Sequence, residues 1–267
     1  MTLAVSEDLL QQGHVRVAVD EVGSCSVLSV TLDRPDARNA QTPSTWAALT
    51  AIGDAVERSA VDLVVIRGAG SAFSAGLDRR MFTPEGIPGE TSLAAMAAQS
   101  DEAMAAQIEV YQRAFAWQRQ VSAVTVAAVH GPAIGAGFQL ALACDLLVAT
   151  PEAGFAMRET SYGLVPDLGG TLPLVQAVGY ARAVEMCASG RLVSAEEGYR
   201  LGFVTRVVDD LDAEIDQLRG VVAAAPAGAI RDLLPLLAGA EHASRAEQFA
   251  AERWAQVGRL RSLLGGG

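Results

Sequence analysis

The chain has 267 residues, a formal net charge of -11 at pH 7 and a sequence pI of about 4.7. That length allows one large hydrophobic core, so a single domain is expected. The acidity argues against a nucleic-acid partner, because phosphate binding needs a local basic patch.

The three cysteines, Cys25, Cys144 and Cys187, stand far apart and lack the spacing of a disulfide framework or a zinc site. We therefore expect reduced thiols and no metal. Residues 1–12 carry acidic side chains where a signal peptide needs a basic start and an apolar core. The apolar run 121–129 is shorter than the roughly 20 residues of a membrane-spanning helix. These features predict a soluble, cytoplasmic protein without a membrane partner.

Strands alternate with helices in the first part of the chain. Residues 15–19 alternate with period two and residues 27–32 are rich in β-branched side chains, which predicts a hairpin. Thr42 and Pro43 suit an N-cap and a first helical position, so a helix is expected to about Arg58. Continuous apolar runs, typical of strands buried on both faces, follow at 63–66, 124–129 and 145–149.

The rest of the chain is mainly helical in pattern. Residues 83–102 are poor in β-formers and contain proline and glycine, so we expect a mobile lid loop, followed by a helix near 103–120. Residues 194–197, Ser-Ala-Glu-Glu, have the pattern of a capping box. After Val208, helices are predicted near 212–224, 228–238 and 243–263.

Two glycine-rich turns are the most informative segments. Residues 130–145, HGPAIGAGFQLALACD, run from such a turn straight into a short apolar helix. Residues 73–78, FSAGLD, form a second turn of small residues. Backbone N–H groups and the positive end of a helix dipole can stabilise a developing negative charge. Two such turns predict a two-donor oxyanion hole.

The order and spacing of these turns, with residues 32–40 before them and residues 155–171 and 191–204 after them, resemble the enoyl-CoA hydratase/isomerase (crotonase) family. The resemblance implies an α/β fold of the ClpP/crotonase-like type, with repeated ββα units in a superhelix. It also implies a catalytic core over 1–208 and a C-terminal helical trimerisation region over 209–267. Members of the family bind acyl-CoA thioesters, so the resemblance implies an acyl-CoA substrate. It also implies a homotrimer or homohexamer.

By position in the family motifs, the backbone N–H groups of Leu77 and Ala136 would donate to the thioester oxygen. Ala136 stands where relatives usually carry glycine, but the donor is main chain, so alanine is acceptable if its φ is negative. The alternative interpretation of residues 135–137 is a plain tight turn from strand to helix.

The family hydratases use two glutamates, and the resemblance places only one of them here. Glu159 lies at the place of the second, whereas Gln139 stands at the place of the first. Gln139 cannot exchange a proton near neutral pH, but its amide can orient water or the thioester. Asp167 follows Glu159 in a loop, at a position where some double-bond isomerases of the family carry an acid.

Two carboxyl groups near one acyl chain can remove a proton from one carbon and return it to another. We therefore expect an isomerase that uses Glu159 and Asp167. The structural alternatives are a solvated ion pair of Glu159 with Arg158, and Asp167 as a cap of the next helix. Two other functions stay open: hydration by Glu159 alone with Gln139 holding the water, and acyl-CoA binding without catalysis.

Coenzyme A brings phosphate groups, so an acidic protein must place positive charge locally. Four arginines bracket the two turns: Arg34, Arg38, Arg79 and Arg80. The resemblance places the segment around Arg38 near the pyrophosphate, so Arg38 is the favoured phosphate ligand, and a guanidinium can fork onto phosphate oxygens. The resemblance also places Ala75, Leu77 and Asp78 near the adenine or pantetheine. No cofactor is expected beyond the coenzyme A of the substrate.

Other candidate residues have plainer interpretations. His130 ends an apolar strand and is expected to be a packed, hydrogen-bonded side chain. Tyr111, Phe115 and Trp117 have helical spacing and are interpreted as core, with the acyl pocket as an alternative. Residues 68–70, Gly-Ala-Gly, lack the third glycine of a dinucleotide-binding loop.

Overall fold

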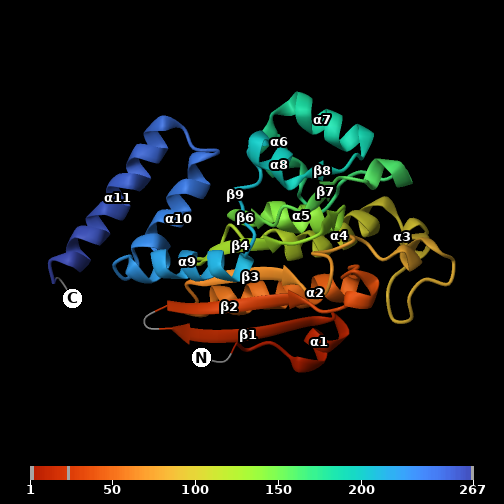
Figure 1. The fold of residues 1–267 in the computed structure, drawn as a ribbon, viewed down its shortest axis with the longest axis horizontal. Coiled ribbons are helices and arrows are strands. Elements are labelled where there is room, and N and C mark those ends of the chain that lie inside the picture. The colour runs from red at the N-terminus through yellow and green to blue at the C-terminus, as the bar shows by residue number, and fades with distance from the viewer. Residues whose placement is uncertain (1–2, 23–24, 266–267) are drawn as a thin grey trace.

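The computed structural model describes residues 3–22 and 25–265, and within them the chain forms two β-sheets (Figure 1). The larger sheet has the order β1-β2-β3-β4-β6-β9, with β1 and β2 antiparallel and the other neighbours parallel. Its strands are β1 (Val15–Val22), β2 (Cys25–Leu32), β3 (Leu63–Gly68), β4 (Val124–Val129), β6 (Leu146–Ala149) and β9 (Arg206–Val207). The smaller sheet contains β5 (Pro132–Ile134), β7 (Gly154–Ala156) and β8 (Val193–Ser194). The predicted hairpin and the three apolar strands are confirmed.

Helices connect the strands and cover the sheets. They are α1 (Glu7–Gln12), α2 (Pro43–Glu57), α3 (Leu93–Ala97), α4 (Asp101–Gln112), α5 (Ala136–Ala143), α6 (Thr171–Val178), α7 (Tyr180–Ser189), α8 (Ala195–Leu201), α9 (Leu211–Ala224), α10 (Ala229–Ala240) and α11 (Arg245–Leu263). Short 3-10 turns lie at Pro35–Ala37, Arg79–Phe82, Arg113–Phe115 and Glu159–Tyr162. The start of α2 is confirmed, because Thr42 and Thr45 form a reciprocal capping box and Pro43 holds the first helical position.

Strand β3 is apolar on both faces because each face lies against a different apolar cluster. Val64 and Ile66 belong to the main core, together with buried side chains of α2. Leu63 and Val65 belong to a smaller cluster that Ile215 of α9 covers. Successive side chains of a strand point to opposite faces, so an uninterrupted apolar run is what a strand between two cores requires.

The structure of residues 83–120 differs from the predicted loop and long helix. Residues 83–102 contain α3, and α4 begins inside the same range after its N-cap Ser100. The helix predicted over 103–120 was too long, because α4 ends at Gln112 and tightens into the 3-10 turn Arg113–Phe115. Phe115 thereby reaches the core, where its ring centre lies 6.1 Å from that of Trp46.

The capping box predicted at 194–197 is only half formed. Ser194 accepts the Glu197 N–H at the start of α8. The Glu197 carboxylate lies 2.6 Å from Arg191, which also binds Glu185 at 2.6 Å. A charge-assisted pair with Arg191 is stronger than a hydrogen bond from the Ser194 N–H to the Glu197 side chain, so that second bond of the capping box does not form. The helices predicted after Val208 are confirmed as α9, α10 and α11.

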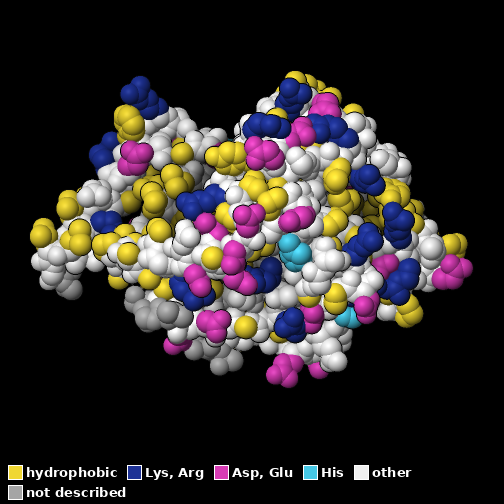
Figure 2. Space-filling view, in the orientation of Figure 1, with side chains coloured by type: hydrophobic (Ala, Val, Ile, Leu, Met, Phe, Trp, Pro, Cys, Tyr) yellow, Lys and Arg dark blue, Asp and Glu magenta, His cyan; other side chains and the backbone are white. Residues whose placement is uncertain are grey.

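Helices α10 and α11 project from the rest of the fold (Figure 1). Neither contains a buried residue. Figure 2 shows hydrophobic side chains exposed at this end of the molecule, and on these helices they include Leu233, Leu237, Phe249 and Trp254. No single helix in the described residues is long and apolar enough to cross a membrane. Helices α9 and α10 meet that test only as a pair, and they are bent by 105°.

The Gly137→Ala substitution tests how tightly the two glycine turns pack. A Cβ at Gly137 would lie 2.5 Å from the Ser74 carbonyl oxygen and 2.8 Å from the Ser74 Cβ. Because these atoms cannot move aside freely, we expect a loss of about 1–3 kcal/mol in the free energy of unfolding, measured by urea titration.

The matched control is Gly239→Ala in α10. No atom lies within 4 Å of a Cβ at Gly239, so stability should be unchanged or rise. The rise expected from helix propensity is at most about 1 kcal/mol. Equal stability of the two variants would show that the turns are not in close contact.

Candidate active site

The two glycine turns lie against each other. Ser74 donates its N–H to the Pro132 carbonyl (3.0 Å) and accepts the Ile134 N–H (2.9 Å). Gly76 comes so close to the second turn that a Cβ there would lie 2.4 Å from the Ile134 carbonyl oxygen and 3.4 Å from the Ala136 nitrogen. Two segments distant in sequence therefore form one continuous backbone surface.

The predicted donors, the amides of Leu77 and Ala136, stand at the edges of this surface. Leu77 pairs with Gln41 in an isolated bridge, in which the Gly76 carbonyl accepts the Gln41 N–H at 2.8 Å and the Asp78 N–H donates to the Gln41 carbonyl at 2.9 Å. These two bonds do not use the N–H of Leu77 itself. Ala136 is the first residue of α5, where an N–H has no acceptor within the helix. Gly135, at φ 53° and ψ -120°, turns the chain into this helix with a conformation that side chains disfavour.

Glu159 carries its carboxyl group next to the turn at Gly135. A Cβ at Gly135 would lie 3.3 Å from Glu159 Oε1, and this oxygen accepts a 2.7 Å hydrogen bond from Gln139 Nε2. Oε2 is buried and has no hydrogen-bond partner among the described residues. Burial raises the pKa of Glu159, hydrogen bonds from the backbone and Gln139 oppose part of this rise, and the charge of Asp167 adds to it.

The alternative interpretation of Glu159 as the ion-pair partner of Arg158 is wrong. Arg158 Nε donates to the Gly190 carbonyl at 3.2 Å, whereas the Glu159 carboxyl is bound by Gln139. None of the ion pairs formed within the described residues involves Glu159, so burial raises the pKa of this carboxyl without an opposing cation.

Gln139 joins Glu159 to the loop that carries Asp167. The residue is 1% exposed, and its Oε1 accepts the N–H groups of Leu168 (3.0 Å) and Gly170 (3.1 Å). Together with the bond to Glu159, these contacts occupy both lone pairs of the amide oxygen and one of its two N–H donors. Gln139 thus connects Glu159 to the loop that carries Asp167. Its role in orienting water or substrate stays a prediction, which rests on the second N–H of the Gln139 side-chain amide.

Asp167 lies between the 3-10 turn Glu159–Tyr162 and α6, with an exposed side chain. The protein atoms around it still remove enough water to raise its pKa. The alternative interpretation as a helix cap is wrong, because the N-cap of α6 is Gly170 and no side chain bonds there. The loop that carries Asp167 is thus bound to Gln139 through the N–H groups of Leu168 and Gly170, and neither the Glu159 nor the Asp167 carboxyl caps the helical turn beside it.

The predicted coenzyme residues Arg38, Ala75 and Asp78 lie together at the first turn. The Asp78 carboxylate lies 2.7 Å from Arg34 and 2.9 Å from Arg80. Burial alone would raise the pKa of Asp78, but hydrogen bonds from Arg80 and Arg34 outweigh it and hold that pKa well below its usual range. Arg38 is exposed and left-handed (φ 51°), and its carbonyl accepts the Ala75 N–H at 2.8 Å.

Asn39 is a buried residue that the sequence analysis did not single out. Its side-chain nitrogen donates to the carbonyls of Ala69 and Ala72, both at 2.8 Å, and its oxygen accepts the Arg34 N–H at 2.9 Å. Asn39 therefore fixes the arginine-bearing segment to the chain that enters the first turn. Asn39 has a positive φ of 54°, a conformation that asparagine tolerates better than most residues. The asparagine that follows Arg38 is therefore a sequence signal for a left-handed turn at this place.

The other candidate residues have structural roles. His130 Nε2 lies 2.9 Å from the Gly70 carbonyl oxygen, which confirms a hydrogen-bonded side chain. Tyr111, Phe115 and Trp117 are buried in the main core, as predicted. The three cysteines are free, and no group of three or more His, Cys, Asp or Glu side chains in the described residues could hold a metal.

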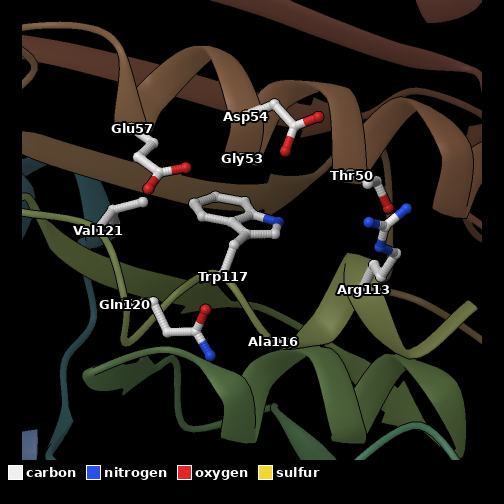
Figure 3. Close-up of a pocket in the computed structure, with 9 residues that line it drawn as sticks. All are labelled: Thr50, Gly53, Asp54, Glu57, Arg113, Ala116, Trp117, Gln120 and Val121. Carbon is white, nitrogen blue, oxygen red and sulfur yellow. The ribbon is translucent and has the colours of Figure 1, made fainter. Parts of the chain in front are cut away.

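A cavity of about 170 Å³ lies between α2 and the segment that follows α4, where Trp117 packs beside Gly53 (Figure 3). Its lining includes Asp54, Glu57 and Arg113 but no residue of the two glycine turns and neither carboxyl of the predicted pair. This cavity is therefore separate from the candidate active site.

Comparisons with known proteins agree with this geometry. The sequence profile of the enoyl-CoA hydratase/isomerase family matches residues 23–253. The protein YhaR of Bacillus subtilis is 35% identical over 182 residues, which cover 67% of this chain and 65% of YhaR. The mitochondrial Delta(3,5)-Delta(2,4)-dienoyl-CoA isomerase of Mus musculus is 32% identical over 192 residues, which cover 71% of this chain and 58% of the isomerase. The chain thus spans less than two thirds of the length of these two relatives.

Solved structures match nearly the whole chain. A Thermobifida fusca YX protein crystallised in complex with CoA is 40% identical, with a TM-score of 0.88, and the match covers 98% of both chains. The crystal structure from the same organism in complex with acetoacetyl-CoA gives 40% identity and a TM-score of 0.87, over 96% of this chain and 98% of that one. The predicted α/β crotonase fold is confirmed, and the chain belongs to the enoyl-CoA hydratase/isomerase family of enzymes.

Proposed function

We propose that this protein binds an enoyl-CoA thioester and moves its double bond, with Glu159 and Asp167 as the two proton-transfer groups. The observation that carries the proposal is the Gln139 side chain, which binds Glu159 at 2.7 Å and the Asp167 loop at 3.0 and 3.1 Å. A neutral amide at this place leaves Glu159 and Asp167 as the pair of acids, instead of the two glutamates of the hydratases.

In the proposed reaction the amides of Leu77 and Ala136 bind the thioester oxygen. Their closeness is supported by the 3.4 Å separation between a Cβ at Gly76 and the Ala136 nitrogen. Glu159, as the carboxylate, removes a proton from C2 of a 3-enoyl thioester, and the negative charge moves to the thioester oxygen. Oriented amides stabilise that charge more than the neutral carbonyl, which lowers the barrier.

Asp167, as the neutral acid, gives its proton to C4. The electrons of the broken C2–H bond form the C2–C3 double bond, and the former C3–C4 double bond takes the new proton. Glu159 ends protonated and Asp167 ends ionised, and proton exchange with water restores both. Burial raises the pKa of both groups, because removal of water disfavours the charged form of each carboxyl.

The coenzyme part of the substrate is proposed to lie along the first turn. Arg38 is exposed there and binds the phosphates, and Ala75 lines the pantetheine. Asp78 acts through Arg34 and Arg80, because both arginines occupy its carboxylate. The Thermobifida fusca YX complex with CoA supports a coenzyme site of this kind. The chemistry needs no cofactor beyond the coenzyme A of the substrate.

We also propose a homotrimer or homohexamer, with residues 209–267 as the trimerisation region. The apolar side chains that α10 and α11 leave exposed support this assembly, since large exposed apolar patches mark association surfaces.

Parallel incubation with a 3-enoyl-CoA and a 2-enoyl-CoA tests the reaction type. We expect the 3-enoyl thioester to be converted to the 2-enoyl thioester, and the 2-enoyl thioester to gain little water, because a second catalytic glutamate is missing. Chromatography with mass detection separates the isomers and the hydrated product. Dominant hydration would reject the isomerase in favour of the hydratase alternative, and tight binding without either product would leave an acyl-CoA-binding protein.

Glu159→Gln tests the proposed base. The variant keeps the side-chain volume but cannot accept the C2 proton, so exchange of that proton into deuterated water should fall by about 10²–10⁴-fold. Coenzyme A affinity, measured by calorimetry, should be nearly unchanged. The exposed Glu196→Gln variant in α8 is the control and should exchange normally. Normal exchange in Glu159→Gln would reject Glu159 as the base.

Gln139→Leu tests the electrostatic link to Glu159. The base must be ionised, and its raised pKa predicts that kcat falls with decreasing pH at a midpoint above 4.5. Loss of the Gln139 N–H removes a bond that favours the carboxylate, so the midpoint should move to still higher pH. Kinetics from pH 4 to 9 measure the shift. A midpoint equal to that of the parent protein would show that Gln139 does not influence Glu159.

A further inference from the structure

One peptide group in the candidate site is held from both sides by glutamines. The carbonyl of Asp167 accepts a 2.7 Å hydrogen bond from Gln112 Nε2, at the last position of α4. The N–H of Leu168 donates to Gln139 Oε1 at 3.0 Å. The Asp167 carbonyl and the Leu168 N–H belong to the same planar peptide, so these two bonds fix the orientation of that plane.

A fixed peptide plane also fixes the residue next to it. The two bonds oppose rotation about the bond between the Asp167 Cα and its carbonyl carbon, so they restrain the backbone from which the Asp167 side chain extends. Gly170 adds a third bond to Gln139 (3.1 Å), after Gly169 has turned the chain at φ 88°. The loop lacks regular secondary structure between Gly163 and Gly170, so side-chain bonds of this kind decide its conformation.

We propose that Gln112 is a positioning residue for Asp167, and that Gln112 and Gln139 together hold the Asp167 peptide for proton delivery to C4. The proposal rests on the isomerase function proposed above. Gln112 touches no reacting atom, and it acts through the main chain of Asp167. Because Gln112 is the last residue of α4, its hydrogen bond connects this helix, which follows the predicted lid segment, to the main chain of the proposed proton donor Asp167.

The two half-reactions should depend on Gln112 differently. Removal of the C2 proton uses Glu159, whose carboxyl is bound by Gln139 and not by Gln112. Delivery of a proton to C4 uses Asp167, and a misplacement of about 1 Å in a reacting group can cost up to about a hundredfold in rate. Loss of Gln112 should therefore slow delivery and spare removal.

The experiment uses the full chain and a 3-enoyl-CoA in deuterated water, with three variants. Gln112→Leu removes the N–H donor from an exposed position. Gln107→Leu is the control on the same helix, since the Gln107 side chain is half-buried and has no hydrogen bond within the described residues. Asp167→Asn removes the proposed acid. Mass spectrometry and NMR measure deuterium exchange at C2 and deuterium incorporation at C4 separately.

We expect Gln112→Leu to lower C4 incorporation and kcat for isomerisation by about tenfold to a hundredfold, while C2 exchange and KM stay near those of the parent protein. Gln107→Leu should behave as the parent protein in every measurement. A general structural defect would instead lower C2 exchange and C4 incorporation together, and this outcome would overturn the proposal.

A double-mutant cycle separates this proposal from the proposed function. If Gln112 acts through Asp167, adding Gln112→Leu to Asp167→Asn should cause no further loss of C4 incorporation. Full additivity of the two losses, or an unchanged C4 incorporation in Gln112→Leu alone, overturns the role of Gln112 and leaves the isomerase standing. Unchanged C4 incorporation in Asp167→Asn overturns Asp167 as the acid and the positioning role with it.

Discussion

The whole site depends on the close approach of two backbone turns. Residues 74–77 and 133–137 pack main chain against main chain, and a Cβ at Gly76 or Gly137 would meet a carbonyl oxygen at 2.4 or 2.5 Å. The approach is possible because β3 and β4 are neighbours in the larger sheet, so both segments leave it at the same edge. In the proposed reaction, amides held by such packing would not have to reorganise when charge develops on the thioester oxygen, which is the basis of electrostatic preorganisation.

Gln139 places a neutral amide, instead of a second carboxylate, next to Glu159. A carboxylate at position 139 would face the Glu159 carboxylate across a 2.7 Å contact, and like charges with little water between them repel strongly. The neutral amide binds Glu159 and still satisfies two loop N–H groups. What remains is Glu159 Oε2, a buried oxygen without a protein partner among the described residues. Such an atom costs free energy in the resting protein and is expected where chemistry uses it.

Local sequence signals predicted much of the fold and the backbone of the site. The apolar runs of β3 and β4, the Thr42-Pro43 helix start and the C-terminal helices follow from periodicity and capping. The end of α4 was mispredicted because packing of Phe115 against Trp46 overrides helix propensity. Gln112 was missed for a related reason. Its bond to Asp167 joins a common polar residue to a main-chain atom 55 positions away, and no local pattern encodes such a contact.

The arginines around Asp78 have a chemical consequence besides charge. Every one of the 20 basic residues in this sequence is arginine. Lysine readily loses its proton when it is desolvated and then attacks carbonyl carbons, whereas the guanidinium of arginine stays protonated. A thioester bound along this turn, as proposed, would meet guanidinium groups that attract phosphate and no lysine amine. Because the sequence contains no lysine, an activated acyl compound has no lysine side chain to acylate in this protein.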